Sequence, residues 1–387
     1  MMISLSRQEI VRTAKLMVVK VGTNVLITKD GRLNEERIRQ LISEICEIRK
    51  QGLSVILVSS GAVGTGMGYL NVKRRPTEHP KLQAMAAIGQ CKLMQVYEEA
   101  LSAHGVLAAQ ILLTAGDLSR RQRYLNVRNT FRTLLDYGVL PIVNENDTVS
   151  VEELNSTFGD NDRLSCLVAN LFPEPLLVLL TDVDGLYDGN PAKASSRLVP
   201  VVDHWTSDLM EMVAEKKSNR SKGGMSSKLK AAQMTTASGG SVIIANGDNP
   251  TVLSEIYSGL ETGTVFFPQK RLQARKRWLG FAVVPKGTLT VDDGAVNVLV
   301  HKGKSLLPIG VVHCNGKFEK GDVVSIIDRN HTEIARGLSN YSDRDVCLIR
   351  GRSSREIREI LGQCPYEEVV HSDNMQVCVD RSRHVAS

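Results

Sequence analysis

The sequence of 387 residues is poor in aromatic side chains, which make up 4% of it. Its interior must therefore be filled mainly by aliphatic side chains, and hydrophobic residues account for 42% of the chain. No apolar run approaches the roughly 18 residues that suggest a membrane span, so we expect no membrane association. The first 20 residues lack the apolar stretch of a secretory signal, because Arg7, Glu9, Arg12 and Lys15 interrupt them. We therefore expect a cytoplasmic protein.

Cysteines at the spacing of a metal site are also missing. The chain has seven cysteines, no two of which are separated by two residues. This argues against a cysteine zinc site and a disulfide framework, and we expect reduced thiols and no protein-bound metal. Net charge is small as well, since 48 basic and 42 acidic residues leave +6. Such an excess is compatible with a phosphate-bearing ligand, whereas a dedicated nucleic-acid binder more often has a concentrated basic stripe.

Short aliphatic runs alternate with helical patterns over the first two thirds of the chain. Asn34 is expected to cap a helix, and the spacing of apolar residues between Leu82 and Val96 predicts another. This alternation predicts an α/β three-layer sandwich with a mostly parallel central sheet covered by helices on both faces. We expect the buried strands at Leu16–Val21, Ser54–Val58, Val106–Leu113, Val139–Val143, Leu176–Leu180 and Val242–Ala245.

The chain changes character after about Phe267. From about Val283 the expected strands become short and turns frequent, which predicts a second, small and mainly β domain. We expect a catalytic domain over 1–267, a linker over 268–282, the second domain over 283–361 and a tail without periodicity over 362–387. The linker is basic because it contains Lys270, Arg271, Arg275, Lys276 and Arg277.

The loops after the strands carry the candidate chemistry, because ligands of open parallel sheets bind beyond the carboxyl ends of the strands. Lys20 ends the first strand beside Gly22, where an ammonium group can approach phosphate oxygens. The glycine-rich segment 59–68 can turn tightly and expose N–H groups to an anion. It is neither a Walker A loop nor G-x-G-x-x-G, which argues against a P-loop NTPase and a dinucleotide-binding enzyme.

Three further segments are polar where a strand or helix begins or ends. Short polar and acidic side chains cluster at 144–147 and again at 159–162, where they can bind a substrate ammonium or cap a helix. Thr181 and Asp182 follow another strand. Segment 221–228 places paired glycines, two serines and Lys228 at the start of a helix, an arrangement that can bind phosphate at the helix N-terminus.

These segments, in this order, resemble the amino acid kinase family, and within it the members that phosphorylate glutamate. The resemblance covers about Lys15 to Phe267. The segment from about Val283 to Leu361 resembles a PUA domain, most clearly at Phe318–Val324. The resemblance implies the amino acid kinase fold and transfer of the γ-phosphoryl group of ATP to the side-chain carboxylate of L-glutamate. That reaction is the first step of proline synthesis from glutamate.

The resemblance also implies roles for individual residues. Lys20 and Lys228 are expected to stabilise the transferred phosphoryl group, and Asp162 to organise the two lysines. Ser60, Asp147 and Asn161 match glutamate-binding positions. The positions that match the ATP site are Lys20, Thr181, Asp182, Lys222, Gly223, Gly224, Met225, Ser226, Ser227 and Lys228. Mg²⁺ is expected to bind mainly to the phosphates, proline to act as a feedback inhibitor, and the chain to form a homo-oligomer, a dimer or a tetramer.

Two alternatives stay open at this point. Another acyl acceptor, such as acetylglutamate or aspartate, would fit the same fold, although kinases for these acceptors do not usually carry a PUA domain. An RNA-binding protein that acts through the PUA-like domain is an alternative from another class. One segment also departs from the family pattern. Ser221-Lys222 stands where the family usually has Gly-Thr, which stiffens the turn and adds a charge beside the phosphates.

Overall fold

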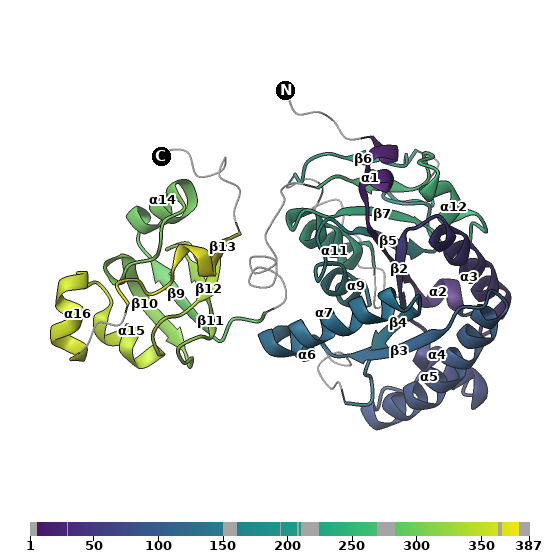
Figure 1. The fold of residues 1–387 in the computed structure, drawn as a ribbon, viewed down its shortest axis with the longest axis horizontal. Coiled ribbons are helices and arrows are strands. Elements are labelled where there is room, and N and C mark those ends of the chain that lie inside the picture. The colour runs from purple at the N-terminus through teal and green to yellow at the C-terminus, as the bar shows by residue number, and fades with distance from the viewer. Residues whose placement is uncertain are drawn as a thin grey trace. The chain divides into compact units, whose positions relative to one another are not determined.

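The computed structural model describes residues 6–28, 30–149, 161–193, 195–206, 209, 224–268, 283–362 and 366–378. The chain folds as two compact units, one formed mainly by residues up to 268 and the other mainly by residues from 283 onward (Figure 1). Except for Pro268, the expected linker lies outside the described residues, as do Lys222 and Gly223 of the expected ATP site.

The larger unit is built on an eight-stranded sheet with the order β3-β4-β2-β1-β5-β7-β8-β6. Neighbouring strands run parallel except β7 and β8, so the expected mostly parallel sheet is confirmed. The strands are β1 (Leu16–Val21), β2 (Ser54–Ser59), β3 (Ala108–Leu113), β4 (Leu140–Glu145), β5 (Leu176–Thr181), β6 (Val201–Val202), β7 (Ser241–Asn246) and β8 (Thr264–Phe266).

Helices cover both faces of this sheet and make the three layers that the sequence predicted. The side chains of α3, α5 and α12 join one continuous apolar core with alternate residues of the central strands. On the opposite face α9 packs against β1, β2, β4 and β5, and α11 packs against α9 and β7. The helices are α1 (Arg7–Thr13), α2 (Thr23–Leu26), α3 (Glu35–Lys50), α4 (Ala62–Tyr69), α5 (His79–Ser102), α6 (Ala115–Ser119), α7 (Arg121–Asp136), α9 (Asn161–Ala169), α11 (Met225–Ala237) and α12 (Val252–Tyr257).

The local patterns explain most of these elements. Every residue of β1, β4 and β5 is buried, as the continuous aliphatic runs predicted for strands covered on both faces. Asn34 caps α3, and its side-chain oxygen accepts a hydrogen bond from the N–H of Arg37. Strand ends differ from the expected positions by one or two residues, which is the usual uncertainty of such boundaries.

Glycines allow α4 and α5 to pack in close contact. A Cβ atom at Gly66 would lie 2.0 Å from the carbonyl oxygen of Met85, and one at Gly89 would lie 1.8 Å from that of Ala62. No side chain can occupy such a gap, so these positions require glycine. Gly61, just before α4, has a φ of +94°, in the left-handed region that favours glycine. The glycine-rich segment thus builds a turn and a helix contact.

The smaller unit contains a five-stranded sheet with the order β10-β9-β11-β12-β13 and a core of its own. The strands are β9 (Gly287–Val291), β10 (Val311–Gly316), β11 (Val323–Ile327), β12 (Glu333–Leu338) and β13 (Met375–Val377). The helical segments are α14 (Asp293–Lys302), η2 (Pro308–Gly310), α15 (Asp343–Ile349), α16 (Ser354–Leu361) and η3 (Ser372–Asn374). β13 lies where the sequence shows no periodicity, and Val369 and Val370 before it are fully buried.

Candidate active site

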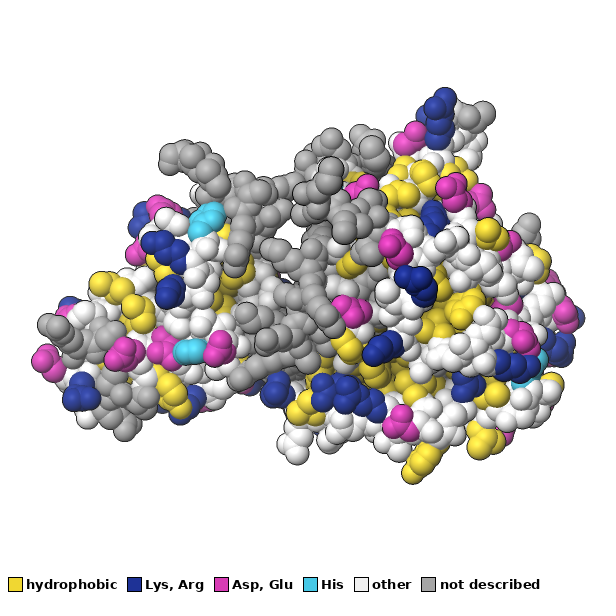
Figure 2. Space-filling view, turned by 45° about the horizontal axis from the view of Figure 1, so that its top comes forward, with side chains coloured by type: hydrophobic (Ala, Val, Ile, Leu, Met, Phe, Trp, Pro, Cys, Tyr) yellow, Lys and Arg dark blue, Asp and Glu magenta, His cyan; other side chains and the backbone are white. Residues whose placement is uncertain are grey.

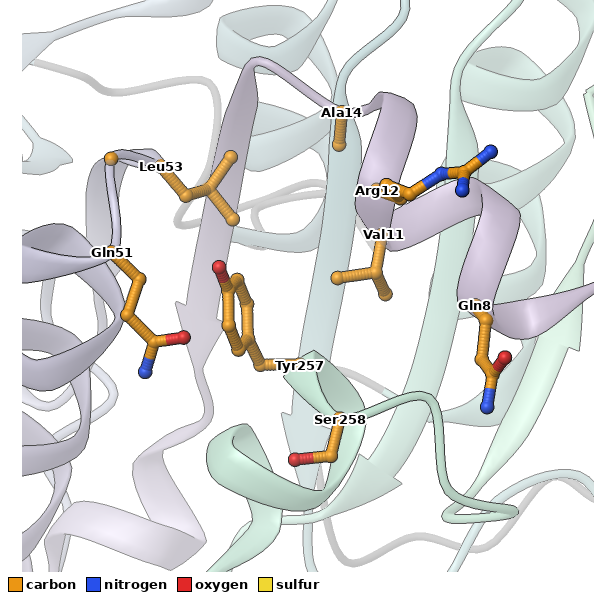
Figure 3. A pocket seen from close by; sticks show the side chains of 9 residues that line it. Gln8, Val11, Arg12, Ala14, Gln51, Leu53, Tyr257 and Ser258 are labelled. Atoms are coloured by element: carbon orange, nitrogen blue, oxygen red, sulfur yellow. The ribbon is translucent and has the colours of Figure 1, made fainter.

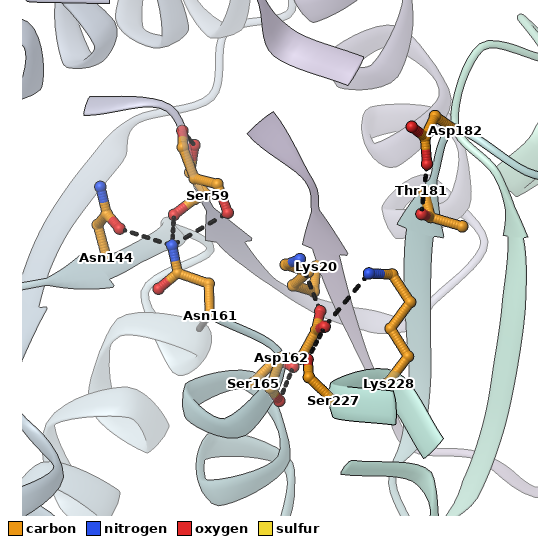
Figure 4. Close-up of polar contacts among 11 residues, drawn as sticks. Lys20, Ser59, Asn144, Asn161, Asp162, Ser165, Thr181, Asp182, Ser227 and Lys228 are labelled. Carbon is orange, nitrogen blue, oxygen red and sulfur yellow. Dashed lines mark hydrogen bonds and ion pairs between the residues drawn. The ribbon is translucent and has the colours of Figure 1, made fainter. Parts of the chain in front are cut away.

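Four neighbouring strands end at one edge of the larger sheet and bring polar side chains together there. β1, β2, β4 and β5 are parallel neighbours, so their carboxyl ends share this edge. Figure 4 shows Lys20 from β1, Asp162 from α9 and Lys228 from α11 converging beside the strand ends. Residues more than 200 positions apart in the sequence thus lie together at the carboxyl ends of the strands, where the sequence predicted a ligand site.

Asp162 links the two lysines. One carboxylate oxygen lies 2.6 Å from Nζ of Lys20, and the other lies 3.3 Å from Nζ of Lys228. The second oxygen also accepts a 2.5 Å hydrogen bond from Oγ of Ser227. The exposed fractions are 0% for Asp162, 3% for Lys20 and 5% for Lys228. The three charges are therefore held in fixed positions and shielded from water.

The electrostatics of this cluster favour an anionic ligand. Burial alone would raise the pKa of Asp162, but the charges of Lys20 and Lys228 outweigh it and hold that pKa well below its usual range. Asp162 is therefore ionised at neutral pH, and one carboxylate faces two ammonium groups. The cluster keeps one excess positive charge in a site of low dielectric, where it attracts a negatively charged group strongly.

Asn161, the first residue of α9, is anchored by three hydrogen bonds. Its Nδ2 donates to the carbonyl oxygen of Ser59 at 2.9 Å, to Oγ of Ser60 at 3.0 Å and to Oδ1 of Asn144 at 3.0 Å. Its Oδ1 is buried and has no hydrogen-bond partner within the described part of the chain. A buried acceptor without a partner is costly, so this oxygen is well placed to receive a ligand donor.

Asp147 lies in a cavity of about 550 Å³ that is lined by α5, β3 and the residues after β4. Burial raises the pKa of Asp147 to about 6, and the charge of Arg75 opposes this rise. Gln90 lines the same cavity and accepts a 2.7 Å hydrogen bond from Nδ2 of Asn144. The hydrogen bonds of Gln90 and Asn144 thus lead from the lining of this cavity to Asn161, and the described contacts include none directly between Asp147 and Asn161.

Thr181 is the last residue of β5 and Asp182 follows it, on the side of Lys20 away from Asn161 (Figure 4). Asp182 accepts hydrogen bonds from Nδ2 of Asn24 at 2.8 Å and from Oγ1 of Thr181 at 3.1 Å. Burial raises the pKa of Asp182, but the hydrogen bond from Asn24 and further hydrogen bonds lower it to below its ordinary value. This carboxylate is therefore a fixed hydrogen-bond acceptor at the strand end.

The segment from Gly224 onward opens α11. Gly224 is the N-cap and has no side chain to satisfy the first N–H groups of the helix, while Met225 and Ser226 form its first turn. Such groups can bind a phosphate. Ser227 and Lys228, expected at the ATP site, have side chains that contact Asp162.

Sequence reasoning did not select several residues that support the site. Asn144 stands within a polar segment that the sequence did single out, so its contact with Asn161 could have been anticipated. Asn24 on α2 belongs to the segment singled out after the first strand, but its contact with Asp182 was not predicted, because that partner is distant in the sequence. Gln90 on α5 gave no signal for the same reason. The same holds for the 2.9 Å hydrogen bond between the hydroxyl groups of Ser59 and Tyr97, which joins α5 to the end of β2.

Other features of the molecule do not extend this site. A hollow of about 380 Å³ lies near the start of β1 and is lined by residues that include Val11, Leu53 and Tyr257 (Figure 3). It contains none of the predicted site residues.

On the face shown in Figure 2, basic and acidic side chains are interspersed over the larger unit. Within the described residues, no three His, Cys, Asp or Glu side chains are grouped to hold a metal ion.

Comparison with known proteins identifies the family. Residues 15–246 match the model of the amino acid kinase family. The chain belongs to the amino acid kinase family. Residues 287–361 match the model of the PUA domain. The resemblance that the ordered motifs predicted is thus confirmed for both parts of the chain.

Curated relatives match this amino acid kinase over almost its whole length. A protein of Rhodopirellula baltica is 45% identical over 370 residues, which are 95% of each chain. A protein of Geobacter sulfurreducens is 45% identical over 373 residues, which are 96% of this chain and 100% of that protein. Both relatives are named glutamate 5-kinase. A solved carbamate kinase from Giardia lamblia is 21% identical, covers 66% of this chain and 99% of its own, and has a TM-score of 0.46.

Of the described helices, none combines the length and the apolar character that are needed to cross a bilayer.

Proposed function

We propose that this amino acid kinase transfers the γ-phosphoryl group of ATP to the side-chain carboxylate of L-glutamate, which gives L-glutamyl 5-phosphate for proline synthesis. The observation that carries the proposal is the buried cluster in which Asp162 holds Lys20 and Lys228. Its excess positive charge can stabilise the negative charge of a phosphoryl group while that group is transferred. The glutamate 5-kinases that match almost the whole chain support glutamate as the acceptor.

The chemistry demands no general base. A glutamate side chain has a pKa near about 4.3 and is ionised at pH 7, so it is already a nucleophile. One carboxylate oxygen attacks the γ-phosphorus of ATP, the bond from that phosphorus to the bridging oxygen breaks, and ADP leaves with the electron pair. The enzyme must therefore position two anions and stabilise the charge that spreads over the transferred group.

Lys20 and Lys228 supply that stabilisation in this proposal. Both ammonium groups are buried and held by one carboxylate, so they need little reorganisation when the transition state forms. Asp162 is a positioning residue, because it acts on the phosphoryl group through the two lysines. Thr181, Asp182 and the start of α11, with Lys222 and Gly223 preceding it, would bind the nucleotide.

Asn161, Ser60 and Asp147 would recognise glutamate. The unpartnered Oδ1 of Asn161 can accept a hydrogen bond from the α-ammonium group, and ionised Asp147 can pair with the same charge. Proline has a carboxylate and a protonated nitrogen in a similar relation. We therefore propose that proline inhibits by competing at this site. Assembly into dimers or tetramers, and RNA binding by the PUA domain, stay predictions.

Mg²⁺ bound to the ATP phosphates would neutralise part of their charge. The donor set of the described residues fits an ion held mainly by phosphate and water, because Asp162 is already engaged by two lysines and a serine. We assign no protein ligand to it.

A hydroxamate assay tests the proposed activity. Purified enzyme is incubated with ATP, Mg²⁺ and hydroxylamine, and with L-glutamate, N-acetylglutamate or L-aspartate in parallel. An acyl phosphate reacts with hydroxylamine, so we expect product only with L-glutamate. Product with another acceptor would keep the chemistry and replace the substrate, whereas no product from folded enzyme that binds ATP would refute the proposed reaction.

A further inference from the structure

Two of the free cysteines lie side by side in the smaller unit. Cys314 is on β10 and belongs to the apolar core, whereas Cys347 is on α15 and is exposed. α15 packs directly against β10. One thiol is therefore open to solvent, and the other lies behind it in the protein interior.

The helix geometry brings the two sulfur atoms together. Sγ of Cys314 lies 3.9 Å from the carbonyl oxygen of Asp343, the first residue of α15. Cys347 stands four residues further along the helix and is therefore on the same face, with its side chain directed back over the turn that begins at Asp343. The thiol of Cys347 is thereby placed beside that of Cys314 and contributes to raising its pKa.

We propose that Cys314 and Cys347 form an oxidation site that takes hydrogen peroxide and closes a reversible disulfide between β10 and α15. This inference is independent of the proposed kinase activity. It also leaves the expected resting state unchanged, since both thiols are free in the structure.

The reaction proceeds in two balanced steps. The exposed sulfur of Cys347, as thiolate, attacks one peroxide oxygen, the O–O bond breaks, and hydroxide leaves while a sulfenic acid forms. The sulfur of Cys314 then attacks this sulfenic sulfur, the S–O bond breaks, and the disulfide forms with loss of water. Peroxide is thereby reduced by two electrons and the thiol pair is oxidised by two. A small dithiol reverses the change by exchange.

The arrangement determines which cysteine reacts first. Burial, followed by the neighbouring Cys347, raises the pKa of Cys314 to about 12, so Cys314 stays a protonated thiol until the first step has occurred. Cys46 and Cys166 are buried, and burial raises the pKa of each thiol. Cys91 is exposed like Cys347 but lies on α5 of the other unit, which makes it a matched control.

Peroxide treatment of the full-length, pre-reduced protein tests the proposal. Free thiols are then alkylated under denaturing conditions and the peptides are mapped by mass spectrometry. We expect a peptide pair joined through Cys314 and Cys347, two fewer alkylated thiols, and full reversal by dithiothreitol. The cross-link should be absent from Cys347→Ser and Cys314→Ser, and unchanged in Cys91→Ser.

A thermal measurement gives a second readout that does not depend on a variant. Closing the long loop between the two cysteines restricts the unfolded chain, so the unfolding midpoint of the smaller unit should rise by several degrees after oxidation and fall again after reduction. Sulfinic acid on Cys347 without the cross-link, or a disulfide that joins either residue to Cys364, Cys378 or another cysteine instead, would overturn the proposal.

Discussion

The side-chain oxygen of Gln90 accepts a 2.7 Å hydrogen bond from Nδ2 of Asn144 and so fixes which way the Asn144 amide faces. With its nitrogen turned to Gln90, Asn144 presents Oδ1 to Nδ2 of Asn161. Asn161 in turn keeps its own Oδ1 available for a ligand. A residue on α5 thus orients an acceptor on α9 through one intermediate side chain.

We therefore predict that Gln90→Leu raises the glutamate KM about tenfold, the equivalent of one hydrogen bond, with little change in kcat. Gln90→Glu keeps an acceptor for Asn144 and should restore most of the affinity. Initial rates over a range of glutamate concentrations separate the two constants, with Gln83→Leu on the same helix as the control. Equal KM values for Gln90→Leu and the control would show that Gln90 does not orient Asn161 through Asn144.

Removing either lysine of the charge cluster should affect catalysis more than binding. We expect Lys20→Ala and Lys228→Ala to lower kcat by at least ~100-fold, as loss of one preorganised charge-stabilising donor does in other enzymes. Lys230→Ala removes the same charge from the same helix two residues away and should leave kcat nearly unchanged. Steady-state kinetics at saturating ATP and glutamate measure this, and wild-type turnover in both lysine variants would remove their proposed role.

Neutralising Asp162 should damage both stability and activity. In Asp162→Asn two buried ammonium groups lose their counter-ion, and breaking a buried pair in this way costs about 3–5 kcal/mol. We expect a clear fall in the unfolding midpoint by calorimetry, together with a kcat at least ~100-fold lower. Because folding lowers the pKa of Asp162 from 3.8, its contribution to stability is present above about pH 4 and is lost only under more acidic conditions. A variant as stable as the wild type would contradict this account.

Glutamate binding should depend on pH through Asp147. The pKa of this carboxyl group is about 6, so it is neutral below that pH and ionised above it. Glutamate keeps its own charges between pH 5 and 8. We therefore expect kcat/KM for glutamate to rise with pH through about 6 and then to level off. Asp147→Asn should raise KM and flatten this profile, and a profile that the substitution leaves unchanged would place the titrating group elsewhere.

A methyl group at the contact between α4 and α5 should destabilise the larger unit. Gly66→Ala would place its Cβ 2.0 Å from the carbonyl oxygen of Met85, which only a shift of the helices can relieve. We expect a loss of several degrees in the unfolding midpoint, of the order seen when a packed core is overfilled. Gly116→Ala in α6 has its nearest neighbour at 3.6 Å and should be neutral or slightly stabilising. Equal midpoints would show that the helices adjust freely.

The sequence predicted those features that local patterns determine. The fully buried strands read as continuous aliphatic runs, and the Asn34 cap was visible because a cap and its helix are adjacent. The charge cluster needed the ordered set of motifs, since nothing local indicates that Lys20 and Lys228 share one carboxylate. The family resemblance predicted that Asp162 organises both lysines, and the structure gives the distances from its carboxylate oxygens to the two Nζ atoms.

Other features depend on contacts that a single segment does not reveal. The glycines of segment 59–68 suggested exposed N–H groups, but Gly66 is needed because the backbone of α5 passes beside it. Gln90 looked like any polar residue on a helix surface, because its partner lies 54 residues away. β13 has only three residues, too few for a period, and is held in place by its pairing with β12.

The order in which the three charged residues are synthesised has a consequence for the nascent chain. Lys20 is synthesised first, Asp162 far later and Lys228 last. Of the strands of the larger sheet, only β7 and β8 follow Lys228. Until α11 has left the ribosome, Lys20 and Asp162 balance each other and the excess positive charge does not exist. A chain that is shortened before α11 therefore cannot complete the cluster in which Asp162 holds both lysines.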